Sequence, residues 1–191
     1  MANLRSLPPA AATLAWLLVG TLAWAEDRPP FLPTRDVDIS YDVTRPQKAK
    51  VRERVRWLAA EHLERADGAD KSTTIFDRNK HEITLIIPAN KTYRKLEGER
   101  GRPPEPPADA TLKRGDEAVI AGLPCVDWSW TDEVETHVVC ITADGVLLRH
   151  VVDGQTLRLA RSVSYGRQAA ELFQVPPDYA PALAPDGSLE P

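Results

Sequence analysis

Short runs of alternating apolar and polar residues, separated by tight-turn dipeptides, constrain this chain more than any other feature. The clearest case is VLLRHVV followed by QTLRLARSVSY, joined by Asp153-Gly154, a pair typical of a type I′ hairpin. The run DVDISYDV alternates just as strictly. No strong helical segments alternate with these runs, which disfavours parallel α/β folds. The sequence therefore predicts a mainly β fold, an antiparallel meander of eight to ten strands with little helix, in one strongly curved sheet or partial barrel.

The first 25 residues have the pattern of a secretory signal peptide. Arg5 precedes an apolar run over residues 10–23, and the small residues Ala23 and Ala25 precede a polar pair. The apolar run is shorter than the roughly 20 residues that a membrane span needs. We therefore expect cleavage after Ala25, a periplasmic location and no membrane-embedded part in the mature chain.

Proline-rich segments mark the borders of one expected domain. Residues 26–35 are expected to form an extended lead-in, residues 36–179 a single antiparallel β domain, and residues 180–191 a disordered tail. Within the domain, residues 98–109 contain four prolines and predict a loop. Residues 50–66 fit a helix and strands equally well.

The overall charge and the missing motifs narrow the class of function. The chain has 24 basic and 28 acidic residues, and this mildly acidic balance argues against nucleic acid as a partner. The sequence has no nucleophile elbow, no Gly-rich phosphate loop and no metal-binding histidine pattern. We therefore expect a monomeric protein with no catalytic residues, no cofactor, no metal site and no enzymatic activity.

Both cysteines lie in the stretch GLPCVDWSWTDEVETHVVC, which has the composition of a β-hairpin. With the turn centred between Asp132 and Glu133, residue i faces residue 265 − i, and Cys125 directly faces Cys140. Directly opposed Cβ atoms lie roughly 4.5–5.5 Å apart, and exported cysteines usually pair, so we expect a structural disulfide. A free buried pair and a metal site that includes His137 are the alternatives.

The second half of the chain carries a family resemblance. The elements AGLPCVDW, CITADGVLLR, SVSYG and ELFQVPPDY, within residues 121–179, resemble a group of secreted proteobacterial proteins of unknown function. The start PTRDVDISYDV is similar to theirs as well. Those proteins resemble distant members of the LolA/LolB-like lipoprotein-carrier superfamily. The resemblance implies an open antiparallel half-barrel with an apolar concave face, plugged by helices in the carriers, and a role in binding a lipophilic ligand or a lipoprotein.

Two tryptophans are the main candidates for a binding surface. Trp128 and Trp130 share a strand face with Val126 and together form a large apolar area. This area is core, the wall of a lipid-binding concavity, or a docking patch. We take Trp128, Trp130, Leu85 and Ile87 as candidate lining of the concave face. The alternative function is a ligand-free module that binds an envelope protein through its surface or a sheet edge.

Overall fold

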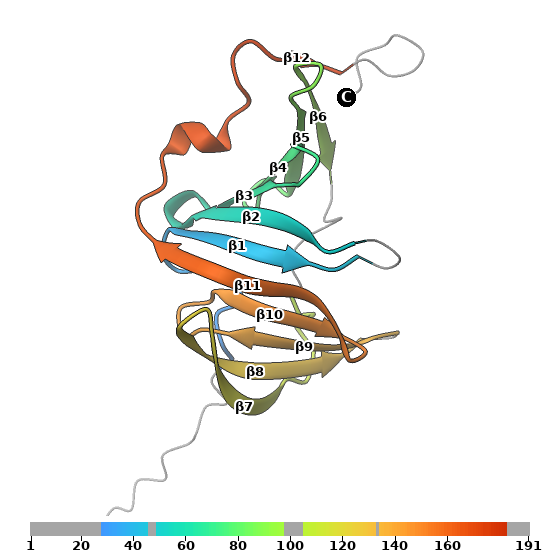
Figure 1. Cartoon of the computed structure of the whole chain (residues 1–191), viewed down its shortest axis with the longest axis vertical. Coiled ribbons are helices and arrows are strands. Elements are labelled where there is room, and N and C mark those ends of the chain that lie inside the picture. Colours follow the sequence, from blue (N-terminus) through green and yellow to red (C-terminus); the bar gives the residue numbers. More distant parts are fainter. Residues whose placement is uncertain (1–27, 46–48, 98–104, 133, 183–191) are drawn as a thin grey trace, which may run out of the picture.

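The computed structural model describes residues 28–45, 49–97, 105–132 and 134–182 (Figure 1). The expected signal peptide lies outside these residues. The described chain forms twelve strands in one open sheet and two short 3₁₀-helices, η1 (Ala59–Glu61) and η2 (Ala170–Phe173). No described helix is long and apolar enough to cross a membrane. The strands are β1 (Val37–Val43), β2 (Val51–Leu58), β3 (Leu63–Asp67), β4 (Thr73–Asp77), β5 (Glu82–Ile87), β6 (Thr92–Glu97), β7 (Lys113–Ile120), β8 (Leu123–Thr131), β9 (Thr136–Ile141), β10 (Leu147–Val152), β11 (Gln155–Tyr165) and β12 (Ala180–Pro181).

The sheet consists of two meanders that meet at the centre. The spatial order is β12-β6-β5-β4-β3-β2-β1-β11-β10-β9-β8-β7, so the β1–β11 pair joins the two halves. In Figure 1 the central strands run across the view while β4 to β6 turn upward, so the sheet curves strongly and stays open. The predicted single curved antiparallel sheet with little helix is confirmed.

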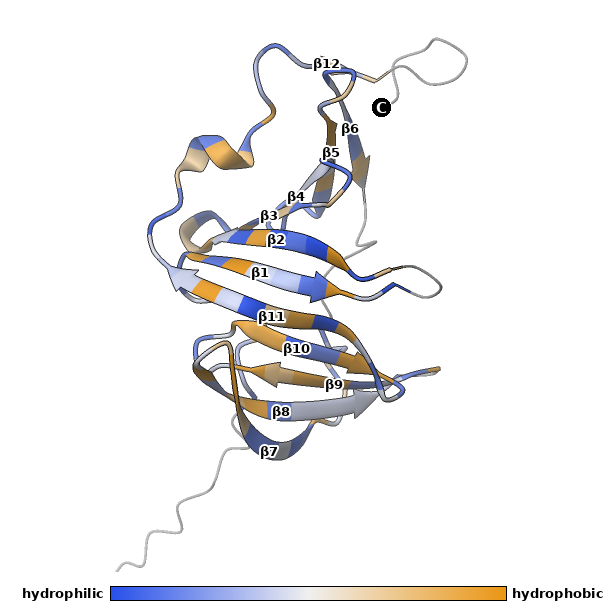
Figure 2. Ribbon diagram, viewed as in Figure 1, coloured by the Kyte–Doolittle hydropathy of each residue, from blue (hydrophilic) through white to orange (hydrophobic). Residues whose placement is uncertain are grey.

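Residues 50–66, which the sequence left undecided, form β2, η1 and β3. Charge pairing explains the choice of strand, because three alternating arginines of β2, Arg52, Arg54 and Arg56, face the acidic side of β1. Arg52 lies 2.9 Å from Asp42, and Arg54 forms a two-nitrogen contact with Asp38. Figure 2 shows the matching alternation of hydrophilic and hydrophobic residues along β1, β2 and β11. These extra strands raise the count above the expected eight to ten.

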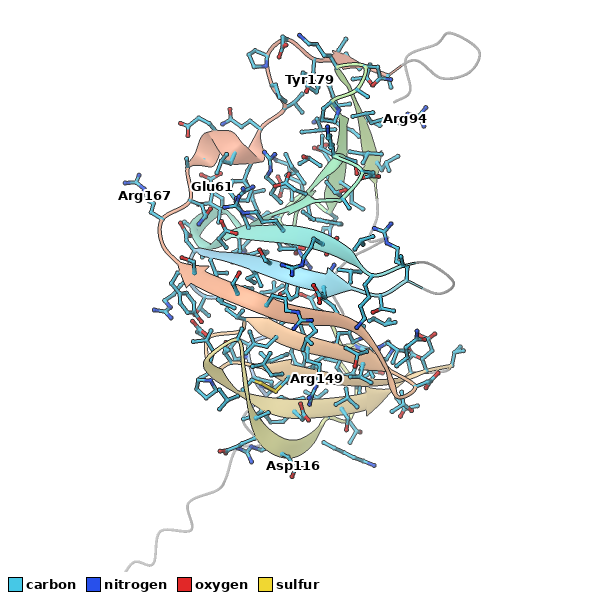
Figure 3. All side chains as sticks on the ribbon, viewed as in Figure 1. Glu61, Arg94, Asp116, Arg149, Arg167 and Tyr179 are labelled. Carbon is cyan, nitrogen blue, oxygen red and sulfur yellow. A yellow bond between two sulfur atoms is a disulfide. The ribbon has the colours of Figure 1, made fainter. Side chains whose placement is uncertain are left out.

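The disulfide between Cys125 and Cys140 is present, with the two Cα atoms 5.4 Å apart, and lies beside Arg149 in Figure 3. The predicted register was wrong by two residues, because Cys140 pairs with Asp127 rather than with Cys125. The cause is the turn, in which the Asp132 carboxylate accepts hydrogen bonds from two later backbone N–H groups and closes a longer loop. A two-residue shift leaves every side chain on its face, so the cysteines still meet diagonally.

The two edges of the sheet differ from each other. At one edge Ala180 and Pro181 pair in parallel with β6, although the sequence assigned residues 180–191 to a disordered tail. The backbone N–H of Ala180 donates to the carbonyl of Lys91 at 3.0 Å. The rest of that tail, from residue 183, lies outside the described residues. At the other edge β7 is mostly exposed, and its pairing with β8 shifts register between Arg114 and Glu117.

Local turn chemistry was predicted well where glycine supplies it. Asp153 and Gly154 have φ values of 46° and 79°, as the type I′ turn between β10 and β11 requires. Near the end of the domain, the short helix η2 buries Phe173 against β3 to β5. The segment that contains η2 packs on the face that bears Ile75 and Thr84, here called the outer face, and runs between β11 and β12 in Figure 1.

Candidate functional site

One face of the sheet, here called the inner face, carries aromatic and charged side chains across the centre. Directly paired residues share a face, so the register places Tyr41, Trp57, His150 and Trp130 together on it. The cysteines lie on the opposite face of β8 and β9, because they alternate with Trp128 and Val139 along these strands. The inner face therefore holds the groups whose chemistry a partner could recognise.

Two proline-rich segments cover part of the inner face. One is the lead-in, defined here as residues 28–34, and the other is the end of the mid-chain loop, residues 105–112. Phe31 packs edge-to-face on Trp130 with ring centroids 5.9 Å apart. Ala110 and Leu112 pack against the same cluster around Trp130. Segments with the composition of connectors thus become part of the core.

The lead-in is held mainly by side chains. The Arg28 guanidinium donates hydrogen bonds to the carbonyls of Pro106, Pro107 and Ala108 at 3.4, 3.0 and 2.9 Å. A single main-chain hydrogen bond ties the described lead-in to the sheet, from the N–H of Thr34 to the carbonyl of Asp144 at 2.9 Å. Three of the seven residues are prolines, which have no N–H to donate.

The turn between β9 and β10 is built to receive the lead-in. Gly145 has φ +87°, and a Cβ at this position would lie 2.1 Å from the carbonyl oxygen of Leu32. Only glycine has both this backbone conformation and this space. The Asp144 side chain next to it forms an ion pair with Arg35 at 2.8 Å. The turn therefore accepts an extended backbone at close range.

The covered inner face has little empty space. The cavity between the lead-in and the sheet measures about 30 Å³ and is lined by Tyr41, Trp57 and Arg158 among others. A volume of this size admits water rather than a lipid chain. A surface groove of about 590 Å³ runs beside the lead-in, between Pro29-Pro30 and the residues Val126, Trp128 and Ile141. This groove is the open continuation of the covered face.

The floor of the inner face contains a buried ion pair. Arg78 donates to the Glu64 carboxylate at 2.8 Å, and both side chains are about 5% exposed or less. Glu105 of the covering loop contacts the same guanidinium at 3.3 Å. Burial raises the pKa of Glu64, while the charge of Arg78 opposes this rise. The pair lies over the Trp57 ring, whose centroid is 5.8 Å from the guanidinium carbon.

A second ion pair lies on the floor next to the lead-in. Arg158 contacts Glu53 at 2.6 Å and stacks over the Tyr41 ring at 5.1 Å. The Tyr41 hydroxyl donates to the carbonyl of Leu147 at 2.6 Å, and burial raises its pKa. Charged groups in these positions make the floor unlike the apolar concave face that the superfamily resemblance implied.

A chain of aromatic rings runs from the lead-in to the centre of the sheet. His137 stacks on Trp130 and on His150, with centroid distances of 5.0 and 5.5 Å. The two histidines share a 3.2 Å contact between ring nitrogens, and His137 also lies 3.0 Å from Asp132. Burial lowers the pKa of His150 to about 4. Backbone hydrogen bonds lower the pKa of Asp132 to about 2.

The four candidate lining residues lie on the inner face in two separate places. Trp128 and Trp130 are buried, at 8% and 4% exposure, under the lead-in and the covering loop. Leu85 and Ile87 are half-buried on β5, on the same face as Ile83. Seven strands separate β5 from β8 in the sheet, so one small ligand does not touch all four residues.

Sequence reasoning missed the charged floor. Glu64, Arg78, Glu53 and Arg158 were not candidates, because their partners come from different hairpins. A signal was present in β3, where Glu64 takes an inward position in the alternation. A charged residue such as Glu64 at an inward-facing position indicates that a partner is buried beside it. The sequence does not identify that partner.

Comparison with known proteins supports the fold and not a family. The sequence matches no protein-family model and no curated protein. The structure resembles an uncharacterized conserved protein from Thermus thermophilus, with a TM-score of 0.55 and 12% identity over 77% of this chain and 89% of that one. It also resembles MucB, with a TM-score of 0.55 and 13% identity over 81% of this chain.

The MucB likeness recurs in a second solved structure, the MucA/MucB complex of Pseudomonas aeruginosa, with a TM-score of 0.52 and 12% identity over 78% of this chain. The chain spans 64% and 58% of the two MucB chains. The chain therefore has a LolA-like fold, which it shares with MucB. The expected membership of a secreted proteobacterial sequence family stays a prediction.

Proposed function

We propose that this protein is a non-enzymatic module of the cell envelope that binds an extended segment of a partner protein on its inner face. The observation that carries this proposal is the lead-in, since the inner face already accommodates an extended polypeptide at close range. The disulfide supports an oxidising compartment such as the periplasm. The fold shared with MucB, which was solved in complex with MucA, supports a protein partner.

Carriage of a lipophilic ligand is the second candidate. The surface groove of about 590 Å³ beside Trp128 supports it, because several of its lining residues are apolar. Small-molecule sites typically measure about 300–1,000 Å³ but bury most of the ligand. The covered cavity of about 30 Å³ is too small for this, and the floor carries buried charges. Both features favour a protein partner.

Site-specific photocrosslinking in the cell tests the proposal. A photoreactive residue replaces Glu117, an exposed β7 residue that lines the groove from the sheet, and a matched control replaces Val134, which is 84% exposed in the turn between β8 and β9. We expect a protein adduct from position 117 and none from position 134, read by mass spectrometry. A lipid adduct at position 117 would instead support the carrier. Equal adducts at both positions, or none, would refute a binding surface on the inner face.

A further inference from the structure

We propose that the lead-in is an internal ligand of the inner face, and that the partner segment resembles it and binds by displacing it. The partner would be an extended, proline-rich peptide with an arginine or lysine three residues before an aromatic side chain. This inference rests on the proposed function, because it names the chemistry of the partner and the regulation of the same site.

The lead-in contacts the sheet as a bound peptide does. It forms no strand of the sheet, and its three prolines favour the extended polyproline II conformation. Such segments dock on aromatic surfaces at low entropic cost, because they are already extended before binding. Its aromatic platform is Trp130, which Phe31 contacts edge-to-face. The main-chain link to Asp144 lies at Thr34, the end of the lead-in next to β1.

The two anchors of the lead-in follow the period of a polyproline II helix. This helix has about three residues per turn, so Arg28 and Phe31 fall on the same side. The guanidinium carbon of Arg28 lies 6.0 Å from the Phe31 ring centroid, which agrees with this placement. Phe31 reaches Trp130 while Arg28 reaches the carbonyls of residues 106–108. A cation and an aromatic side chain at this spacing are therefore the chemistry that the site recognises.

The receiving surface selects for an extended backbone. Gly145 leaves room for the Leu32 carbonyl, and any side chain at that turn would collide with it. The carbonyls of Pro106, Pro107 and Ala108 form a fork that accepts a cation through neutral main-chain oxygen atoms. Both elements lie outside the lead-in and remain when it leaves.

The exposed groove gives an incoming peptide a place to begin. This groove runs along Pro29 and Pro30 and shares Trp128 with the covered face. A peptide bound there lies beside the lead-in and can replace it stepwise. A tethered segment acts at an effective concentration in the millimolar range, so it weakens every competitor until it is released.

Binding of a free copy of the lead-in tests the proposal. The probe is a fluorescein-labelled peptide of residues 28–35, RPPFLPTR, and the readout is fluorescence anisotropy. The full-length double variant Phe31→Ser/Leu32→Ser releases its own lead-in, and we expect it to bind the peptide at least about tenfold more tightly than the wild type. The matched control Val134→Ser removes an exposed apolar side chain away from the groove and should bind as the wild type does.

Two further variants separate release from unfolding. Arg28→Ser removes only exposed or half-exposed contacts and should give a smaller gain, about threefold, with an unchanged circular dichroism spectrum. Adding Gly145→Ala to the release variant should abolish the gain, because the new Cβ blocks the peptide carbonyl. A peptide with serine in place of Phe31 should bind at least about tenfold more weakly.

The outcomes distinguish this inference from the proposed function. The internal-ligand proposal would be overturned if the wild type, Phe31→Ser/Leu32→Ser and Arg28→Ser bound the peptide with equal affinity. It would also be overturned if folded Arg28→Ser did not bind the peptide. Protein crosslinking at position 117 together with failed peptide binding would mean a partner of different chemistry. Peptide binding without any protein crosslink would keep the internal ligand and overturn the proposed partner.

Discussion

Two segments cover the sheet on opposite faces, and they are held in different ways. The lead-in covers the inner face from β8 across to β2 through side chains and one main-chain hydrogen bond. The C-terminal segment covers the outer face of β3 to β5, where Phe173 is buried and Arg65 donates to the carbonyl of Leu172 at 2.6 Å. Its far end joins the sheet as β12 and carries an ion pair between Lys91 and Asp178. Main-chain pairing at the end of a segment fixes it, whereas side-chain anchors allow exchange.

The largest expected effect on stability comes from the buried ion pair between Glu64 and Arg78 on the floor of the inner face. Arg78→Met leaves Glu64 buried without its partner, which should lower the free energy of unfolding by about 3–5 kcal/mol. Arg149→Met removes a comparable pair with Asp127 that is partly exposed, and should cost about 1 kcal/mol. Urea unfolding of both variants measures the difference. Similar losses of unfolding free energy in the two variants would mean that the buried Glu64–Arg78 pair matters no more than a partly exposed pair.

Two phenylalanine-to-alanine substitutions compare how much the lead-in and the C-terminal segment contribute to stability. Phe173→Ala should cost about 3–4 kcal/mol, since the side chain is almost fully buried. Phe31→Ala should cost only about 1 kcal/mol, mainly for the edge-to-face contact with Trp130. Urea unfolding gives both values. A cost for Phe31→Ala equal to that of Phe173→Ala would show that the lead-in is as firmly built in as the C-terminal segment.

The disulfide should affect the half of the sheet under the lead-in. The double variant Cys125→Ser/Cys140→Ser opens a loop of about 15 residues, a loss of about 3 kcal/mol and about 6–12 °C in Tm. Hydrogen exchange should accelerate in β8 and β9 before β4 and β5. Wild-type protein with reductant serves as the matched control. Uniform acceleration across the sheet would contradict two halves of unequal stability.

The last expected effect, which acts only below neutral pH, is a pH dependence carried by His150. Its pKa in the folded protein is about 4, below the ordinary value of 6.5, so the unfolded chain binds the proton more readily. Stability from this group is complete above pH 6.5 and is lost as pH falls toward 4. His150→Gln should flatten the stability curve in this window, whereas Val134→Ser, which removes no titrating group, should leave its slope unchanged. Thermal unfolding between pH 4 and pH 7 measures both, and parallel curves would assign the slope to other groups.

The sequence predicted what local chemistry determines. The alternation along β1 and the Asp153-Gly154 turn each depend on neighbours in the chain, and both were predicted correctly. The register of the cysteine hairpin failed because the Asp132 side chain, rather than residue type alone, sets the loop length. A hydrogen bond of this kind has no periodic signature in the sequence.

The covers and the charged floor could not be predicted, because they are long-range features. Proline-rich stretches indicate connectors, and nothing in RPPFLPT indicates that Phe31 meets a tryptophan 99 positions later in the chain. The pairing of Glu64 with Arg78 likewise joins β3 to the turn after β4. Trp128 and Trp130 lie on one face of β8, but what covers them depends on tertiary packing.

The two edges of the sheet have a consequence for how the protein behaves at high concentration. An open sheet with bare edges is a template for adding further strands from other molecules. Here β12 occupies the rim of β6, while β7 breaks its ladder between Arg114 and Glu117 and displays charged side chains. Both features hinder the addition of strands from a second molecule at the described edges of the sheet.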